Sequence, residues 1–237
     1  MNLRKIWGIA SREFASFFVS PIVYGFLSAF LFLLGYFTVG MVVNAQRAEL
    51  SLTLILFVFL IFAPLLTMRL IANERSTGTI EFVFTSPVRA SEFILGKYLA
   101  VLGVFGSSVL FTVEFPAFLI WIGDPDLQIL MTQYLGLILV GASFLSIGLL
   151  CSCLTENQIV AAVFCFVLLL LLWTMSVLKG MIPSGYTALV EAFDLQNRIQ
   201  NFQNGLLKFN DVWFFLSVIV TSLYSSILYL NSRSWRE

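Results

Sequence analysis

The sequence contains no histidine, and only 11% of its 237 residues are charged. The missing histidines remove the commonest metal ligand and the commonest general base. Soluble domains carry about 25% charged residues, and a domain of this size cannot bury enough of its surface to manage with so few. With 59% hydrophobic residues, the chain is predicted to be an integral membrane protein in contact with the lipid bilayer.

Cysteine and net charge are also scarce. The three cysteines are Cys151, Cys153 and Cys165, and no histidine accompanies them. They allow either a copper or zinc site or simple packing, and we favour packing and predict no metal. Because 13 basic residues balance 13 acidic ones, we expect no nucleic-acid partner.

A phosphate-binding loop is missing as well. The single Gly-Lys pair, Gly96-Lys97, has Ser91 where the first glycine of the loop belongs and Tyr98 where Ser or Thr belongs. No protease, esterase or kinase signature is present either. We therefore expect a chain without catalytic residues or a bound cofactor, which is not itself an enzyme.

Apolar stretches of about 20 residues, long enough to cross roughly 30 Å of hydrocarbon, occur six times. They are continuously apolar and do not alternate, so they predict helices and not barrel strands. The expected spans are residues 21–43, 51–68, 98–122, 129–154, 159–178 and 212–230. The predicted fold class is an all-α integral membrane protein with six transmembrane helices.

Lys and Arg residues in the flanking segments predict the orientation. With the N-terminus inside, the cytoplasmic side carries nine of them and the outer side only four: Arg47, Lys179, Arg198 and Lys208. Both termini of this multi-pass chain are therefore expected in the cytoplasm, in a cell membrane that we take to be an inner membrane.

We expect one transmembrane domain over residues 1–237, with two amphipathic segments outside the spans. Residues 1–20 hold an interfacial helix at 3–18 and precede spans one to five at 21–178. Residues 179–211 form an outer segment, in which the periodicity at 188–206 predicts a helix on or dipping into the outer leaflet. Span six and a cytoplasmic tail make up 212–237.

The longest cytoplasmic loop, residues 73–92, contains a short helical stretch that Pro87 ends. Its apolar residues Phe82, Val83 and Phe84 need a covering surface. Either a partner protein covers them, or they fold back on the membrane face of the same chain.

Glu114 is the one carboxylate well inside a predicted span, close to Pro116. An ionisable residue at membrane depth is a functional candidate. Glu114 is either a substrate-path or gating residue, or a structural hydrogen-bonded carboxyl near the outer interface.

Five segments, in order, resemble the ABC-2 type transporter permeases. The strongest is MRLIANERSTGTIE at 68–81 followed by TSPV at 85–88; the others are SPIVY at 20–24, GDPD at 123–126, SCLTENQ at 152–158 and NFQNG at 201–205. The sequence is particularly similar to the branch associated with gliding motility and with copper and nitrous-oxide reductase maturation.

The resemblance implies a permease that works with a dimer of cytoplasmic ATPases, which hold the ATP and Mg²⁺. It also implies a second permease, either identical or a paralogue, and in this branch an auxiliary outer or periplasmic subunit. The loop between spans two and three would carry a coupling helix that docks on the ATPase. The matching residues are Glu74, Arg75, Gly78, Thr79, Ile80, Glu81, Phe82, Phe84, Ser86 and Pro87. A second cytoplasmic contact would be formed by Thr155, Glu156, Asn157 and Gln158.

The expected function is therefore to couple ATP hydrolysis on a separate chain to export or to force transmission across the membrane. Two alternatives stay open. One is an ion-coupled secondary transporter that uses Glu114, and the other is a membrane scaffold for a surface machine such as a gliding apparatus.

Overall fold

The computed structural model describes residues 2–45, 52–80, 88–117, 126–178 and 194–234, and all regular secondary structure in these ranges is helical. In chain order the helices are α1 (Leu3–Val19), α2 (Pro21–Ala45), α3 (Leu52–Thr67), α4 (Ala72–Ser76), α6 (Ala90–Phe111), α8 (Leu127–Leu154), α9 (Gln158–Leu178), α11 (Leu195–Gln203) and α12 (Phe209–Ser234).

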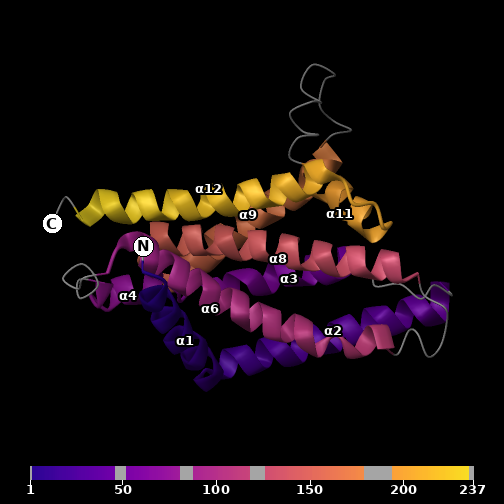
Figure 1. Ribbon diagram of the computed structural model, residues 1–237, viewed down its shortest axis with the longest axis horizontal. Coiled ribbons are helices and arrows are strands. Elements are labelled where there is room, and N and C mark those ends of the chain that lie inside the picture. Colours follow the sequence, from indigo (N-terminus) through magenta and orange to yellow (C-terminus); the bar gives the residue numbers. More distant parts are fainter. Residues whose placement is uncertain (1, 46–51, 81–87, 118–125, 179–193, 235–237) are drawn as a thin grey trace, which may run out of the picture.

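Six helices in the described residues are long and apolar enough to cross a membrane. The predicted class, an all-α integral membrane protein with six spans, is confirmed. An even number of spans returns the chain to its starting side, and Figure 1 shows α1 beginning at the same end of the bundle at which α12 ends. We call this the α4 end, because α4 lies there, and the opposite end the α11 end.

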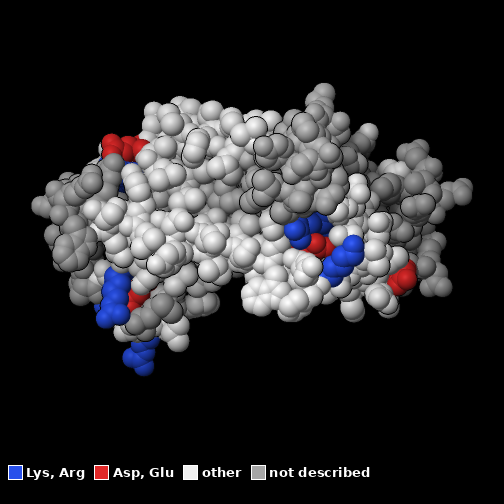
Figure 2. Space-filling model, turned by 90° about the horizontal axis from the view of Figure 1, so that it is seen from above, with Lys and Arg blue, Asp and Glu red and all other residues white. Residues whose placement is uncertain are grey.

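Charged side chains gather toward the two ends of the bundle. On the face seen in Figure 2, Lys, Arg, Asp and Glu lie near either end, and the surface between them is almost free of charge. Such a belt is what a hydrocarbon environment requires, because an exposed charge at membrane depth is costly.

Helix α8 is the centre of the bundle. In the most apolar 18-residue stretch of α8, 78% of the residues are buried inside the bundle. The corresponding shares are 22% for α9 and 17% for α12. Three glycines let neighbouring helices approach α8 closely, because a Cβ atom on any of them would overlap a neighbouring side chain. Gly136 faces Phe202 of α11, Gly141 faces Phe105 of α6, and Gly148 faces Thr67 of α3.

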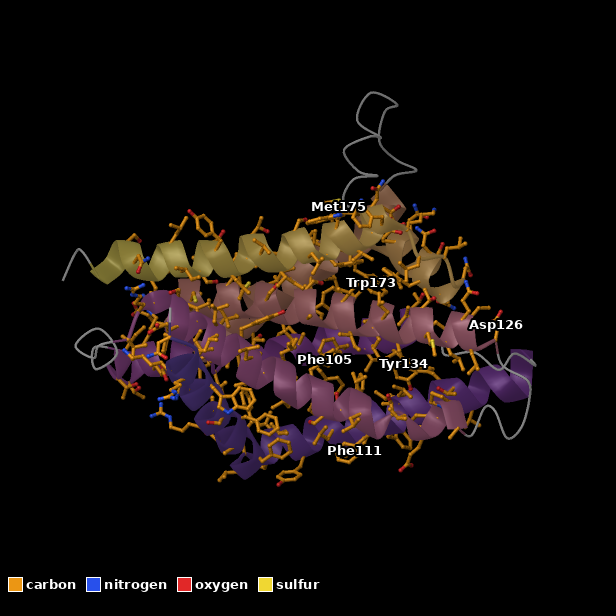
Figure 3. The ribbon with its side chains drawn as sticks, viewed as in Figure 1. Phe105, Phe111, Asp126, Tyr134, Trp173 and Met175 are labelled. Carbon is orange, nitrogen blue, oxygen red and sulfur yellow. The ribbon has the colours of Figure 1, made fainter. Side chains whose placement is uncertain are left out.

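An aromatic cluster fills the middle of the bundle around Phe105, which Figure 3 labels there. Its ring lies 4.5 Å from that of Phe59 and 6.5 Å from that of Phe30. All three side chains are at most 1% exposed. Helices α2, α3 and α6 therefore meet α8 through one continuous packed core.

Helix α1 is the amphipathic helix expected at 3–18, and it packs lengthwise against α6 (Figure 1). Ile9 packs over Gly96 and Phe14 packs over Gly103. These two glycines of α6 therefore let α1 approach α6 closely. The other side of α1 stays open, with Leu3 and Trp7 more than 70% exposed.

One predicted boundary of the third span is wrong. This span was expected at 98–122, but its helix begins at Ala90; the described part of the span runs to Ala117, and the expected end lies outside the described residues. The start was missed because Glu92 and Lys97 interrupt the apolar run, and the structure buries both in polar contacts.

The described part of the outer segment has a helix only at Leu195–Gln203, shorter than the predicted 188–206, of which 188–193 lie outside the described residues. Its apolar residues Leu195, Ile199 and Phe202 are buried, and the helix packs on α8, α9 and α3. The amphipathic pattern is thus accounted for by packing within the chain.

Candidate functional site

The chain reverses direction at the α4 end, between α3 and α4, and a serine of α8 holds this turn. Ser152 Oγ accepts hydrogen bonds from the backbone N–H groups of Ile71 and Ala72, both at 3.1 Å, and donates to Met68 O at 3.1 Å. The first N–H groups of a helix need acceptors, and the N-cap residue of α4, Ile71, has no side chain that could serve. Ser152 therefore caps α4 from another helix.

One side of α4 is fastened by Arg75. Its guanidinium donates to Cys153 O at 2.7 Å and to Glu156 Oε1 at 2.9 Å, and it lies 5.8 Å from the ring centre of Tyr229 on α12. The Arg75 side chain is 6% exposed whereas that of Glu156 is 65% exposed. The ion pair thus connects the buried Arg75 to Glu156, which lies on the surface at the α4 end.

The other side of α4 is fastened by Glu74, which binds a buried lysine. Lys97 Nζ on α6 lies 2.8 Å from Glu74 Oε1 and 3.2 Å from Glu13 Oε1 on α1, and 5.0 Å from the ring centre of Phe93. The Lys97 side chain is only 2% exposed. A cation at this depth is stable only when it is paired, so the two carboxylates tie α4, α6 and α1 together.

The two segments predicted as separate ATPase contacts lie side by side. Besides the Arg75–Glu156 pair, Gln158 Nε2 donates to Asn73 Oδ1 at 2.6 Å. Residues 72–76 and 155–158 therefore make up one surface, which we call the α4 surface.

Helix α4 ends in a turn that only glycine adopts easily. Gly78 has φ +73° and donates its N–H to Arg75 O at 3.2 Å, the left-handed ending common after helices. Thr79 Oγ1 donates to Glu74 O at 3.2 Å, and the half-buried Ile80 packs against the core. The remaining predicted coupling residues Glu81, Phe82, Phe84, Ser86 and Pro87 lie outside the described residues.

Glu114 lies at the α11 end, three residues beyond α6, and its side chain is exposed. The helix breaks here because Pro116 has no N–H to donate and its ring crowds the carbonyl of Thr112 four residues earlier. Thr112 O instead accepts from Tyr134 Oη of α8 at 2.8 Å, toward the α11 end in Figure 3.

The sequence placed Ser152 among small residues of the fourth span that let helices approach closely, but it did not identify Ser152 as a cap or Lys97 and Glu13 as an ion pair. The signal for Lys97 was a charge beside an apolar helical run, which predicts a buried pair but does not name its partners; Glu13 follows Arg12 in an amphipathic segment and carried no such signal. No sequence signal identifies Ser152 as the cap of α4, because the contact joins residues 80 positions apart. Among the described residues, no group of three or more His, Cys, Asp and Glu side chains could hold a metal ion.

Six apolar helices around a buried core, with charged clusters at the two ends, define a multi-pass membrane protein. A family model described as "ABC-2 family transporter protein" matches residues 43–196. Since this is more than half of the chain and includes the whole α4 surface, the chain belongs to the ABC-2 transporter family. No curated protein matches the chain.

Family and fold together make the chain a permease subunit of an ABC transporter, and so a transport subunit and not an enzyme. The family implies partnership with an ABC ATPase and usually with a second permease. The match does not distinguish the branches of the family.

Proposed function

We propose that this permease couples ATP hydrolysis on a separate, dimeric ATPase to export or to force transmission, and that the α4 surface receives the ATPase. The observation that carries the proposal is the joining of residues 72–76 to 155–158 by the Arg75–Glu156 and Asn73–Gln158 contacts. A single docked protein could press on both segments at once.

A movement of α4 caused by the ATPase would be transmitted to most of the bundle through short hydrogen bonds and ion pairs. Ser152 links α4 to α8, Arg75 links it to the C-terminal end of α8, and the Glu74–Lys97–Glu13 cluster links it to α6 and α1. Packed helices respond to such a load by rigid-body shifts between alternative arrangements. In this proposal, those shifts are the transport or force-generating step.

The proposal requires the α4 end to face the cytoplasm, where ATP is available. The excess of Lys and Arg in the segments at this end supports that orientation. ATP and Mg²⁺ would bind to the ATPase alone. A second permease, identical or a paralogue, would complete the bundle, and we place the assembly in an inner membrane.

The five matching sequence segments support membership of the gliding-motility and copper or nitrous-oxide reductase maturation branch. In that branch an auxiliary outer subunit would complete the assembly. Export and force transmission both fit this architecture, since each needs only the same coupled motion.

The test is purification of the chain from its host membrane in mild detergent, followed by identification of bound proteins and an ATP hydrolysis assay. We expect an ABC ATPase to co-elute in stoichiometric amount. The proposed docking contact also includes the predicted coupling residues 78–87 that follow α4. Replacing Phe82 and Phe84 with Asp is therefore expected to remove the ATPase, because the double variant would place two charges in this contact.

The matched control replaces Leu206 and Leu207, two exposed apolar residues at the α11 end, with Asp. This control is expected to keep the ATPase. Retention of ATPase and of coupled hydrolysis by the Phe82/Phe84 variant would contradict the docking site.

A further inference from the structure

A cavity of about 290 Å³ opens at the α4 end between α1, α2, α3, α4 and α6. Its volume is close to the lower limit of about 300 Å³ for small-molecule sites. Its polar lining comes from several elements and consists of Glu13, Ser16, Ser20, Arg69, Asn73, Glu74 and Lys97. The cavity is large enough to hold a small ligand or the headgroup of a larger one.

One wall of the cavity is lined by two carboxylates and one ammonium group. Glu13 and Glu74 share the ammonium group of Lys97, each through one carboxylate oxygen, and Glu13 Oε1 also lies 3.8 Å from Nη2 of the exposed Arg12. The second oxygen of Glu74, Oε2, is enclosed and has no hydrogen-bond partner among the described residues. A buried acceptor without a donor is destabilising, so this wall favours a ligand that brings a cationic N–H donor.

A positive charge, opposite in sign to the carboxylates of Glu13 and Glu74, comes from Arg69. This residue lines the same cavity and is exposed. Its Nη1 donates to Ser20 Oγ at 3.4 Å, a long contact that leaves most of the five guanidinium donors available for an anion. Arg and Ser side chains together are a common phosphate-binding combination. The cavity therefore offers one group for an anion and one for a cation.

The cavity lies at the level of a membrane interface. Helix α1, which forms one of its walls, exposes Trp7 and Leu3 beside Arg4 on its open side, the composition of an interfacial helix. The apolar part of the lining includes Leu65, which is 40% exposed on α3. A ligand with a polar head in the cavity could thus extend acyl chains along the apolar surface of the bundle.

We propose that this cavity binds the headgroup of a zwitterionic phospholipid with a primary ammonium group, of the phosphatidylethanolamine type. The phosphate meets Arg69 and the hydroxyl of Ser20, and the ammonium meets the carboxylates of Glu74 and Glu13. A choline headgroup fits less well because its quaternary nitrogen has no N–H to donate. The cavity shares Asn73 and Glu74 with the proposed ATPase contact, but lipid binding to it can be measured without any ATPase.

The test is lipid binding to the purified, delipidated full chain, measured by native mass spectrometry without any ATPase. Phosphatidylethanolamine and phosphatidylcholine with the same acyl chains are titrated separately. We expect one tightly bound phosphatidylethanolamine per chain and about tenfold weaker binding of phosphatidylcholine, the effect of one lost charge-assisted hydrogen bond.

Two variants act on the cavity in different ways. Arg69→Gln removes the phosphate partner, and Ser16→Phe fills the space without changing charge; each is expected to weaken phosphatidylethanolamine binding about tenfold. The matched controls are Arg4→Gln and Ala15→Phe on the exposed side of α1, outside the cavity lining, and both are expected to bind the lipid as the parent chain does. If Ser16→Phe does not fold, the comparison of Arg69→Gln with its control Arg4→Gln still tests whether the cavity binds the lipid.

Three results would overturn the proposal. One is equal affinity for the two lipids, and another is unchanged binding in Arg69→Gln. The third is competition by soluble glycerophosphoethanolamine at the concentration at which the lipid binds, which would identify a soluble ligand and not a membrane lipid. Since no ATPase is present, none of these results bears on the docking proposal.

Discussion

At the scale of single residues, Ser152 holds the turn from which α4 projects. Its hydroxyl satisfies two backbone donors and one backbone acceptor that have no helical partners. Ser152→Ala leaves these groups unpaired, and we expect a loss of about 2 kcal/mol in unfolding free energy. For a chain of this length that corresponds to a fall of about 4 to 8 °C in Tm.

Thermal unfolding of the purified chain in nanodiscs measures this effect. Ser146→Ala is the matched control, because Ser146 lies on the same helix and is fully buried, but among the described residues its hydroxyl bonds only to Ser143 O within that helix. We expect its Tm to change by no more than about 2 °C. Equal shifts for the two variants would show that Ser152 does not cap α4.

Lys97 is the second residue on which the α4 surface depends. Lys97→Met leaves Glu13 and Glu74 facing each other without their shared cation. Breaking a buried ion pair in this way costs about 3 to 5 kcal/mol, so we expect severe destabilisation, seen as lost yield or a much lower Tm.

Replacing all three members removes the charges together. The triple variant Lys97→Met, Glu13→Gln, Glu74→Gln is expected to recover most of the stability, because no unpaired charge remains buried. A triple variant as unstable as Lys97→Met would mean that Lys97 contributes by packing and not by charge.

At the scale of helices, close approach at α8 glycines determines the packing. A Cβ atom on Gly141 would overlap the ring of Phe105, and that ring cannot move freely because Phe59 and Phe30 enclose it. We expect Gly141→Ala to destabilise the chain by about 1 to 3 kcal/mol.

Gly106→Ala on α6 is the control for this prediction, because nothing lies within 4 Å of its added Cβ. There the better helix propensity of alanine, about 1 kcal/mol, is the main effect, and Tm should stay level or rise. Thermal unfolding of both variants in one lipid composition makes the comparison. If Gly141→Ala is as stable as Gly106→Ala, the two helices do not meet there as described.

Hydropathy predicts elements well where the environment is uniform and poorly where buried polar pairs intervene. The fourth span was expected at 129–154, and α8 occupies Leu127–Leu154. The start of the third was missed by eight residues, because Lys97 and Glu92 read as loop residues until their partners on α1 and α4 are known.

At the scale of the whole molecule, the arrangement of the α4 surface could not be read from the sequence. The resemblance supplied two separate segments, around Glu74 and around Glu156, but the contacts that unite them join residues about 80 positions apart. Their proximity follows from the turn after α3, which Ser152 binds near the C-terminal end of α8.

At this scale, we expect an ABC ATPase to dock on the α4 surface. The most direct measurement is photo-crosslinking in the host cell, with a photoreactive amino acid at Ser76, an exposed residue of α4, and at Gln128, an exposed residue at the α11 end. We predict that Ser76 forms an adduct with an ABC ATPase and that Gln128 does not. An ATPase adduct at Gln128, or none at Ser76 when the ATPase co-purifies with the chain, would contradict the account.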